Sequence, residues 1–332
     1  MTGKTTSLLA SFGLVLTAAI WGFAFVVVKN SLDYVGAVYM IAIRYSMAAI
    51  VMGLIFIKKW RLFDKRYLVH GLITGAFLFT AYTTQTIGCD YTTAGKNAFL
   101  TTVYVILIPL ISWALYKKRP GWYVFVAAIL SLTGIGLLAL GTGDTAGLNL
   151  GDALTLVCGL FYALHIIWTA RYNEQGDDPL FLTLLQFVVC AVFGWILAPI
   201  YDGAFPTAAV QNPRVIGSML YLGLFSTMLC FSLQNIGLKY VQSSLASLFL
   251  SFESVFGVLF STLFLHEHLT VRMIVGCVLI FVAVVLAETK FQFKSRSDGG
   301  EALRQAQGPQ EQAQGPQELA QGPQEQAQGQ QA

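Results

Sequence analysis

Residues 234–267 have the sequence QNIGLKYVQSSLASLFLSFESVFGVLFSTLFLHE, a mostly apolar segment with one acid, Glu253, in its interior. Its opening has an earlier copy. Residues 85–91 are QTIGCDY, so Gln, Ile, Gly and Tyr recur at a displacement of 149 positions (234 − 85). A charged residue at the centre of a membrane helix costs ~2.5–3.5 kcal/mol on insertion scales, and such residues usually serve function. The repeat and the intramembrane acid together favour transport.

The composition places most of this chain in lipid. Of 332 residues, 56% are hydrophobic and 11% are charged, and the mean hydropathy is +0.65. A water-soluble domain does not need so much apolar surface. The net charge is only +3, so we expect no nucleic-acid partner. The expected partners are membrane lipids and a small-molecule substrate, without a cofactor.

Ten apolar stretches are long enough to be membrane helices, in which every backbone polar group is satisfied internally. The sequence therefore predicts an all-α integral membrane protein with ten transmembrane helices. The first stretch lacks an Ala-x-Ala cleavage site, so we expect a retained helix rather than a signal peptide. The predicted spans are residues 9–28, 37–57, 68–88, 95–116, 122–140, 151–170, 180–200, 215–235, 243–265 and 271–287.

Positive charges predict the orientation, because cytoplasmic connections are enriched in Lys and Arg. The connections after the second and fourth spans are rich in both. The opposite side has only Lys29, Lys96, Arg214 and Arg272. We expect a multi-pass plasma-membrane protein with both termini in the cytoplasm. The charges on the cytoplasmic side are Lys4, Lys58, Lys59, Arg61, Lys65, Arg66, Lys117, Lys118, Arg119, Arg171, Lys239, Lys290, Lys294 and Arg296.

The repeat predicts an inverted duplication, because each half contains five spans and an odd number turns the second copy over. Inverted repeats are common in transporters, whose substrate site lies near the midplane where the halves meet. The two halves are residues 1–145 and 146–290. Residues 291–332 form a Gln-, Gly- and Pro-rich tail in which AQGPQE begins at Ala306, Ala313 and Ala320. Pro and Gly in every copy predict cytoplasmic disorder rather than a coiled coil.

These features resemble the drug/metabolite transporter superfamily, in particular its EamA family. Trp21-Gly22 is similar to that family's Trp-Gly pair. The segment LHEHLT at residues 265–270 is similar to its Leu-Gly-Glu-Arg-Leu-Thr motif. The resemblance covers about residues 8–288. It implies a metabolite carrier, often an exporter of amino acids or related compounds.

Glu253 and Arg44 are the two ionisable residues that lie deepest in predicted spans. Glu253 is either part of a structural pair with Arg44 or a cavity residue that binds protons or a substrate amine. Arg44 either snorkels outward, forms that pair, or contacts a substrate carboxylate. The serines around Glu253 are best explained by close helix packing.

Polar and aromatic residues recur at three- and four-residue steps and so share helix faces. One face carries Asn97, Thr101 and Tyr104, and another carries Phe161, His165 and Trp168. His165 is either a hydrogen-bonded core residue or, like Glu253, a candidate for proton coupling. The predicted substrate-binding residues are Trp21, Tyr82, Gln85, Asn97, Tyr104, His165, Trp168, Gln234 and Glu253.

Several other features have plain explanations. The segment His266-Glu267-His268 lacks further ligands nearby, so we predict no metal site. The five cysteines are odd in number and lie in apolar runs, as small core residues do. Pro109 predicts a kink in the fourth span, and Gly71 with Gly75 predicts close helix packing.

The sequence therefore predicts a secondary transporter of a small metabolite, with amino acids or amines as its exported substrates and alternating access as its mechanism. No P-loop is present to support direct ATP drive. Two alternatives stay open: a membrane-embedded enzyme that acts on a lipid-linked substrate, and a non-transporting receptor or subunit. The first lacks a catalytic cluster, so we do not expect an enzyme. The second lacks a sizeable soluble module.

Overall fold

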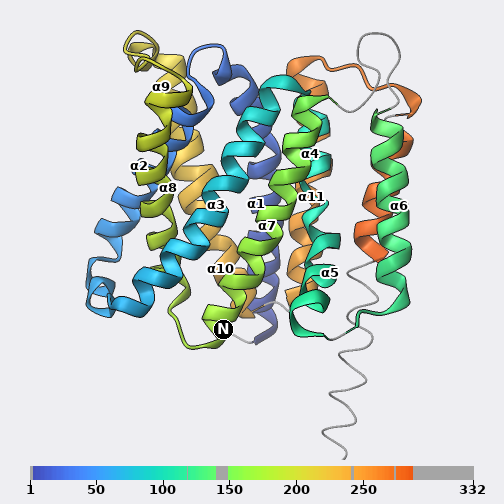
Figure 1. Ribbon diagram of the computed structural model, residues 1–332, viewed down its shortest axis with the longest axis horizontal. Helices are drawn as coiled ribbons and strands as arrows, with labels where there is room; N and C mark the ends of the chain where they lie inside the picture. The colour runs from blue at the N-terminus through green and yellow to red at the C-terminus, as the bar shows by residue number, and fades with distance from the viewer. Residues whose placement is uncertain (1–2, 118, 140–148, 241–242, 273, 287–332) are drawn as a thin grey trace, which may run out of the picture. The chain divides into compact units, whose positions relative to one another are not determined.

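The computed structural model describes residues 3–117, 119–139, 149–240, 243–272 and 274–286. All regular elements in these residues are helical (Figure 1). They belong to one compact unit, Met1–Thr289, and the predicted tail lies outside the described residues. The helices are α1 (Gly3–Leu32), α2 (Ala37–Ile55), η1 (Ile57–Leu62), α3 (Lys65–Tyr91), α4 (Ala94–Thr101), α5 (Tyr104–Tyr116), α6 (Trp122–Ala139), α7 (Leu150–Glu174), α8 (Pro179–Tyr201), η3 (Ala209–Gln211), α9 (Pro213–Leu220), η4 (Tyr221–Leu229), α10 (Cys230–Tyr240), α11 (Ser243–Leu265) and a further apolar helix, Ile274–Leu286.

Six described helical segments are long and apolar enough to cross a membrane. Three shorter apolar helices are Trp122–Leu137, Phe249–Leu265 and Ile274–Leu286. In the described residues, each predicted span is mostly helical, but α3 is not among the six. Helix α3 packs against α7 on one side and α8 on another. These two faces do not contact lipid, so α3 can be less apolar and contain several threonines. The all-helical membrane class is thus confirmed, whereas ten spans in two inverted halves stay a prediction.

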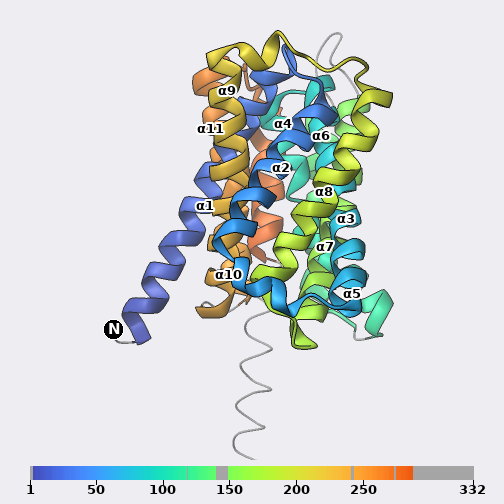
Figure 2. The ribbon, with the colours of Figure 1, turned by 90° about the vertical axis from the view of Figure 1, so that its left-hand side faces the viewer.

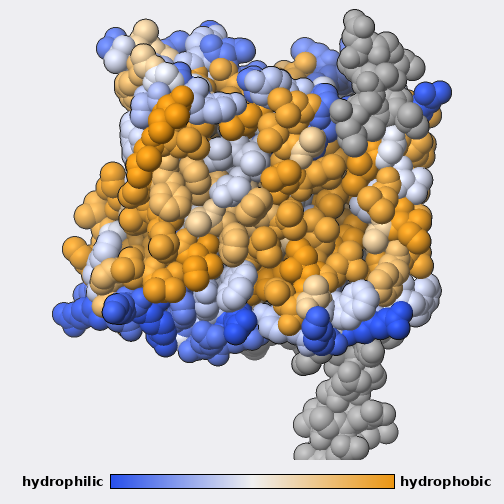
Figure 3. All heavy atoms as spheres, viewed as in Figure 1, coloured by the Kyte–Doolittle hydropathy of each residue, from blue (hydrophilic) through white to orange (hydrophobic). Residues whose placement is uncertain are grey.

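The face seen in Figure 3 has the polarity of a membrane protein. Apolar residues cover its middle, and hydrophilic residues gather along its lower and upper edges. Many large apolar side chains are exposed on the helices, including Ile50 at 62%, Ile196 at 60% and Ile200 at 76%. A soluble protein rarely exposes so wide an apolar surface. This band therefore fits contact with lipid chains.

The core is built from helices far apart in the sequence. The most extensively packed pairs are α3 with α7, α1 with α11, α2 with α8, α3 with α8 and α4 with α11 (Figures 1 and 2). Glycines permit this proximity. A Cβ atom at Gly22 would lie 2.5 Å from that of Phe256, and one at Gly257 would clash with Ala98. These glycines bring α1, α4 and α11 together around one region.

Gly71 and Gly75 have the close-packing role that their spacing predicts. A Cβ atom at Gly71 would lie 2.7 Å from that of Leu185, and one at Gly75 would lie 2.6 Å from that of Val189. Both partners are on α8. The pair therefore lets α3 lie directly against α8, as small residues do between membrane helices.

The fourth span breaks at a position that we did not predict. Pro109 lies within the continuous helix α5, whereas the helix is interrupted at Thr102 and Val103. There the amides of Thr102 and Val103 donate to carbonyls three residues back, at 3.2 and 3.3 Å, and the Thr102 hydroxyl also donates to the carbonyl of Phe99. Threonine hydroxyls compete for backbone carbonyls in this way. The interruption thus lies N-terminal to Pro109, and the kink at Pro109 itself stays a prediction.

The eighth span contains a second irregularity, the π-helical segment η4. Thr227 donates its hydroxyl hydrogen to the carbonyl of Leu222, five residues earlier, at 2.7 Å. Such segments are rare and frequent at functional sites. This one presents the polar pair Ser226 and Thr227 toward α2, beside Arg44.

Candidate functional site

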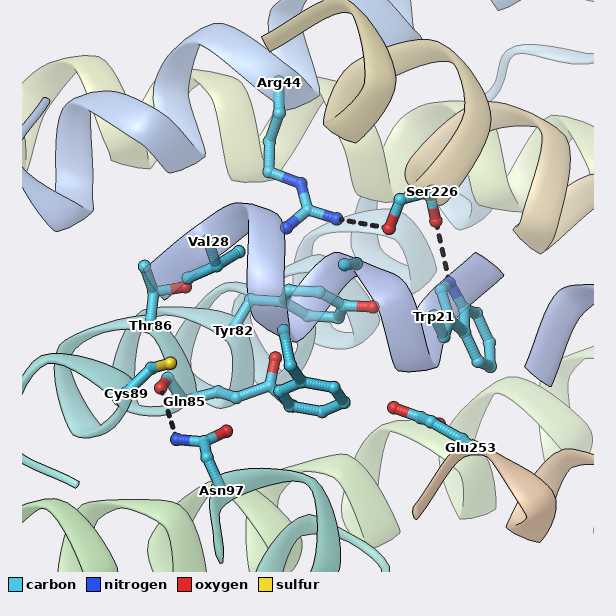
Figure 4. A pocket seen from close by; sticks show the side chains of 12 residues that line it. Trp21, Val28, Arg44, Tyr82, Gln85, Thr86, Cys89, Asn97, Ser226 and Glu253 are labelled. Carbon is cyan, nitrogen blue, oxygen red and sulfur yellow. Dashed lines mark hydrogen bonds between the residues drawn. The ribbon is translucent and has the colours of Figure 1, made fainter. Parts of the chain in front are cut away.

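One small pocket of about 20 Å³ lies where α1, α2, α3, α4, η4 and α11 meet (Figure 4). This volume has room for about one water molecule, so the helices around it must move apart before a metabolite could bind there. Its lining combines aromatic and aliphatic side chains with one guanidinium, one carboxylate and two amides. The lining residues are Trp21, Ala24, Phe25, Val28, Arg44, Tyr82, Gln85, Thr86, Cys89, Asn97, Ser226 and Glu253.

Arg44 points into the protein rather than snorkelling toward a headgroup region, since it is only 2% exposed. Its Nε donates to the hydroxyl of Thr227 at 3.0 Å, and its Nη2 donates to the hydroxyl of Ser226 at 3.3 Å. The guanidinium carbon also lies 5.0 Å from the ring centre of Tyr82. Aromatic faces attract cations at this distance. These neutral partners hold the guanidinium in place without cancelling its charge.

Glu253 lies on α11 and is 7% exposed. Among the residues that the structure describes, no ion pair includes Glu253 or Arg44. The structural Arg44–Glu253 pair, which was one of the alternatives, is thus not formed. Gly257, one turn later on the same helix, sets how closely α11 approaches α4. A carboxylate and a guanidinium consequently line one pocket without a direct bond between them.

Aromatic rings form much of the wall. The indole N–H of Trp21 donates to the carbonyl of Ser226 at 2.7 Å and so joins α1 to η4 (Figure 4). The Trp21 ring lies edge-on to Phe231, with centroids 5.5 Å apart. Tyr82 has a similar edge contact with Tyr45 at 5.6 Å. These contacts fix the rings, so the wall is apolar and preformed.

Two amides line the side formed by α3 and α4. The Gln85 side chain donates to the hydroxyl of Thr101 at 3.1 Å. Asn97 donates through Nδ2 to the backbone carbonyl of Gln85 and to the hydroxyl of Thr155, both at 3.0 Å. Asn97 therefore links α4 to α3 and α7, and its side chain is held rigidly.

The structure brings together five of the nine predicted binding residues: Trp21, Tyr82, Gln85, Asn97 and Glu253. The other four do not line this pocket. The break after Thr101 separates Tyr104 from Asn97, so its ring packs behind the wall, 5.1 Å from Tyr162. Gln234 lies on α10 outside the lining.

His165 and Trp168 lie away from the pocket. His165 Nε2 is 3.1 Å from the amide oxygen of Gln186, which ties α7 to α8. The Trp168 ring lies 5.7 Å from that of Tyr172, near the end of α7. His165 and Trp168 do have the helical spacing on which the prediction was based. Their part of α7, however, packs against other helices and does not line the pocket.

Sequence reasoning missed several lining residues. Ala24, Phe25 and Val28 follow Trp21 at steps of three, four and seven, so the helical period of α1 could have identified them. Thr86, Cys89 and Ser226 had weaker signals. For Ser226, the only signal was the polar pair Ser226-Thr227 in an apolar run. Arg44 was considered as a carboxylate contact but was not among the nine.

Polar networks join helices at two ends of the helical bundle. At one end, Lys96 Nζ lies 3.3 Å from Asp152, whose other oxygen accepts from the Thr92 hydroxyl at 2.6 Å. Near this end, Glu267 accepts from the amides of Ala94 and Gly95 at 2.8 and 3.1 Å. Glu267 thus caps α4, with the favourable charge for a helix N-terminus.

At the other end, basic residues of η1 and α3 meet the turn between α7 and α8. Lys59 forms an ion pair with Asp178. Asp177 is bound by Arg66 at 3.3 Å and by His70 at 2.7 Å. Burial raises the pKa of Asp178. Hydrogen bonds from Lys59 and from the Phe181 amide lower the pKa by a larger amount, so the net pKa lies below its ordinary value. The carboxylate is therefore the stable form.

Comparison with known proteins places the whole helical region in one family. The model of the EamA-like transporter family matches residues 8–140 and 149–289. An uncharacterized transporter of Archaeoglobus fulgidus is 34% identical, with 85% of this chain and 87% of that protein covered. The uncharacterized transporter YoaV of Bacillus subtilis is 24% identical, with 86% and 97% covered.

A solved structure described as "Crystal structure of protein" has a similar fold. Its TM-score is 0.59 at 16% sequence identity, and the match covers 85% of this chain and 95% of that one. The match to the family model, the relative at 34% identity and the apolar helical architecture agree. The chain is a multi-pass membrane protein that belongs to the EamA-like transporter family.

Proposed function

We propose that this chain is a secondary transporter that exports a small zwitterionic or amine-bearing metabolite, of the amino-acid class, across the plasma membrane by alternating access. One observation carries the proposal: Arg44 and Glu253 line the same buried pocket without pairing to each other. A buried charge is costly unless it has a partner. A substrate that brings one charge of each sign would supply both partners.

In a wider state of the alternating-access cycle, the pocket lining would offer a specific pose for such a substrate. Its carboxylate would lie at Arg44 and Ser226, since a guanidinium binds carboxylates through a fork of N–H donors. Its ammonium would lie toward Glu253. The rings of Trp21, Phe25 and Tyr82 would surround the apolar part. Most small-molecule sites have this combination of an apolar wall and a few directing polar groups.

Alternating access is supported by the symmetry of the helix contacts. A two-fold operation that exchanges the halves would map the main packed helix pairs onto one another. It exchanges α1 with α7, α2 with α8, α3 with η4 and α10, and α4–α5 with α11. The pair α3–α7 becomes α10–α1, and α1–α11 becomes α7 with α4–α5. The pairs α2–α8 and α4–α11 map onto themselves. The family model also matches twice. We therefore infer two inverted halves, residues 1–145 and 146–290, with Gln85 and Gln234 at equivalent positions.

Glu253 is also the residue that we propose for proton coupling. It is a carboxylate in the pocket, where protonation and substrate binding would compete for the same oxygens. His165 fits this role less well, because it is bonded to Gln186 outside the pocket. The absence of a P-loop motif from the sequence agrees with secondary rather than ATP-driven transport.

Ligand-induced thermal stabilisation of the purified protein tests this function, because a ligand stabilises by RT ln(1 + [L]/Kd). We would measure the twenty amino acids and, for each that binds, its decarboxylated and its deaminated analogue. Arg44→Gln should weaken ligands with a carboxylate and leave the amine unaffected. Glu253→Gln should do the reverse. If no amino acid or amine stabilises the wild-type protein or is exported by it in proteoliposomes, the proposed function is wrong.

A further inference from the structure

We propose that Asn97 is the hydrogen-bond acceptor that, together with Glu253, selects substrates whose ammonium group carries N–H hydrogens. This inference rests on the proposed function, because it assigns the amine end of the same pocket. It goes further in assigning a specificity to one residue. Trimethylated and deaminated analogues should be rejected at this position.

The contacts of Asn97 determine which of its amide atoms faces each neighbour. The backbone carbonyl of Gln85 can only accept, so the atom 3.0 Å from it must be the nitrogen. The hydroxyl of Thr155 donates its own hydrogen to the carbonyl of Gly151 at 2.7 Å. It therefore accepts the second N–H of Asn97 at 3.0 Å. Both amide hydrogens are used, and a flipped side chain would place its oxygen against the carbonyl oxygen of Gln85.

The oxygen of Asn97 is consequently left as a directed acceptor. Asn97 is 0% exposed, and Oδ1 has no hydrogen-bond partner among the described residues. Most buried polar atoms do have a partner, so an exception in a pocket wall points to a ligand. Figure 4 shows the Asn97 oxygen turned away from the hydrogen bond to Gln85. The acceptor thus lies on the pocket side of a rigid amide.

Glu253 lies across from it on a helix that is fixed relative to α4. Ala98, the residue after Asn97, fills the space that Gly257 leaves on α11. This contact is one turn from Glu253, so the two acceptors are held by a close helix–helix contact. The nearby rings of Trp21 and Phe25 give the site apolar walls. Two acceptors and aromatic faces suit an ammonium group.

The neutral amide oxygen adds a selectivity that Glu253 lacks. A carboxylate attracts any cation, whereas an amide oxygen needs a directed donor. A trimethylammonium group has no N–H and would leave the Asn97 oxygen buried without a bond. A bare metal ion fits less well, because hard cations gather about six or more oxygen ligands. Among the described lining residues, Glu253 is the single acid.

The test uses the full-length protein in detergent, with L-phenylalanine, its N,N,N-trimethyl betaine and 3-phenylpropionate as the ligands. Affinity is measured by thermal stabilisation. Sites built to hydrogen-bond a substrate group reject analogues that lack it by large factors. We expect the wild-type protein to prefer phenylalanine by about 100-fold or more over both analogues. In Asn97→Ala, the ratio of the affinity for phenylalanine to that for the betaine should be less than about a tenth of the wild-type ratio.

Thr155→Val is the matched control, because it removes one support of the Asn97 amide from outside the pocket lining. It should lower the melting temperature as Asn97→Ala does but keep the preference for phenylalanine. If Asn97→Ala does not fold, Asn97→Asp takes its place. That variant replaces the directed amide oxygen with a carboxylate, which attracts any cation, so its preference for phenylalanine over the betaine should also fall, and an undiminished preference would overturn the proposal.

Each remaining outcome is decisive. Equal binding of phenylalanine and its betaine by the wild-type protein overturns the role of Asn97 while leaving an amino-acid transporter intact. Stabilisation by sodium chloride that disappears in Asn97→Ala, without amino-acid dependence, would assign the acceptors to a cation instead. A wild-type protein that binds neither these ligands nor any other amino acid or amine overturns the proposed function as well.

Discussion

Nζ of Lys96 lies 3.3 Å from a carboxylate oxygen of Asp152, although the two side chains are only 8% and 1% exposed. This ion pair connects the start of α4 to the start of α7. In the three described ion pairs of Lys or Arg, the cation comes from residues 1–145 and the acid from residues 146–290, and the contact of His70 with Asp177 runs in the same sense. Attraction between the proposed halves is therefore placed at two ends of the helical bundle, outside the pocket lining.

Breaking this buried pair should destabilise the protein. Lys96→Met leaves the Asp152 carboxylate buried with only the Thr92 hydroxyl and backbone contacts, and removal of one partner of a buried pair costs about 3–5 kcal/mol. We expect a large fall in melting temperature in detergent. The double variant Lys96→Met/Asp152→Asn should recover much of it, and purely additive effects would contradict the coupling.

Glu253 should matter for function more than for folding. Glu253→Gln keeps the size and hydrogen-bonding capacity but removes the charge. Transport in proteoliposomes should fall at least about tenfold or lose its pH dependence, while the amount of folded protein stays near wild type. Glu174→Gln at the exposed end of α7 is the matched control and should leave transport unchanged. Unaltered transport by Glu253→Gln at every pH would remove both the proton and the amine role.

The glycine of the Trp-Gly pair should be intolerant of a methyl group. In Gly22→Ala, the new Cβ would lie 2.5 Å from Cβ of Phe256 and 2.8 Å from the backbone nitrogen of Gly257, so α1 and α11 must separate. Overpacking of this kind costs about 1–3 kcal/mol. Gly136→Ala is the control, because a Cβ there meets nothing within 4 Å. Similar melting temperatures for the two variants would show that close α1–α11 packing is dispensable.

Acid should weaken the junction between η1 and α8. The pKa of Asp178 is lowered in the folded protein, so its contribution to stability is present above the unfolded value of about 3.9 and is lost as pH falls through the folded value. Wild-type melting temperature should therefore fall below about pH 4. Asp178→Asn keeps a capping side chain for α8 but should show a smaller fall over this range, and an identical fall would exclude Asp178 as its source.

The proposed orientation can be tested with single cysteines in a background without the five native ones. Phe63→Cys and Arg119→Cys lie in the basic connections after the second and fourth spans. A membrane-impermeant maleimide should label them only in inside-out vesicles. Thr207→Cys, in the connection between α8 and α9, should react from outside intact cells. The reverse pattern would invert the topology.

The sequence predicted the elements of this fold well, because lipid imposes a simple pattern on each helix separately. Backbone groups must be paired within a helix in hydrocarbon, so length and hydropathy alone reveal a span. The duplicated Gln-x-Ile-Gly-x-x-Tyr motif and the family motifs at Trp21 and Glu267 were also local. The break at Thr102 and the π-segment at Ser226 were not predicted from the sequence. Both depend on side-chain hydroxyls and on packing against neighbouring helices.

Membership of the membrane class, the approximate helix boundaries and the presence of two buried ionisable residues were decided by the sequence itself. Only the tertiary structure decided that Arg44 and Glu253 line one pocket without pairing, that Asn97 turns its oxygen inward, and that His165 and Trp168 lie elsewhere. The physical reason is that helical spacing specifies which residues share a face. Which other helix that face meets depends on contacts such as Gly22 with Phe256 and Gly257 with Ala98, between residues far apart in the chain.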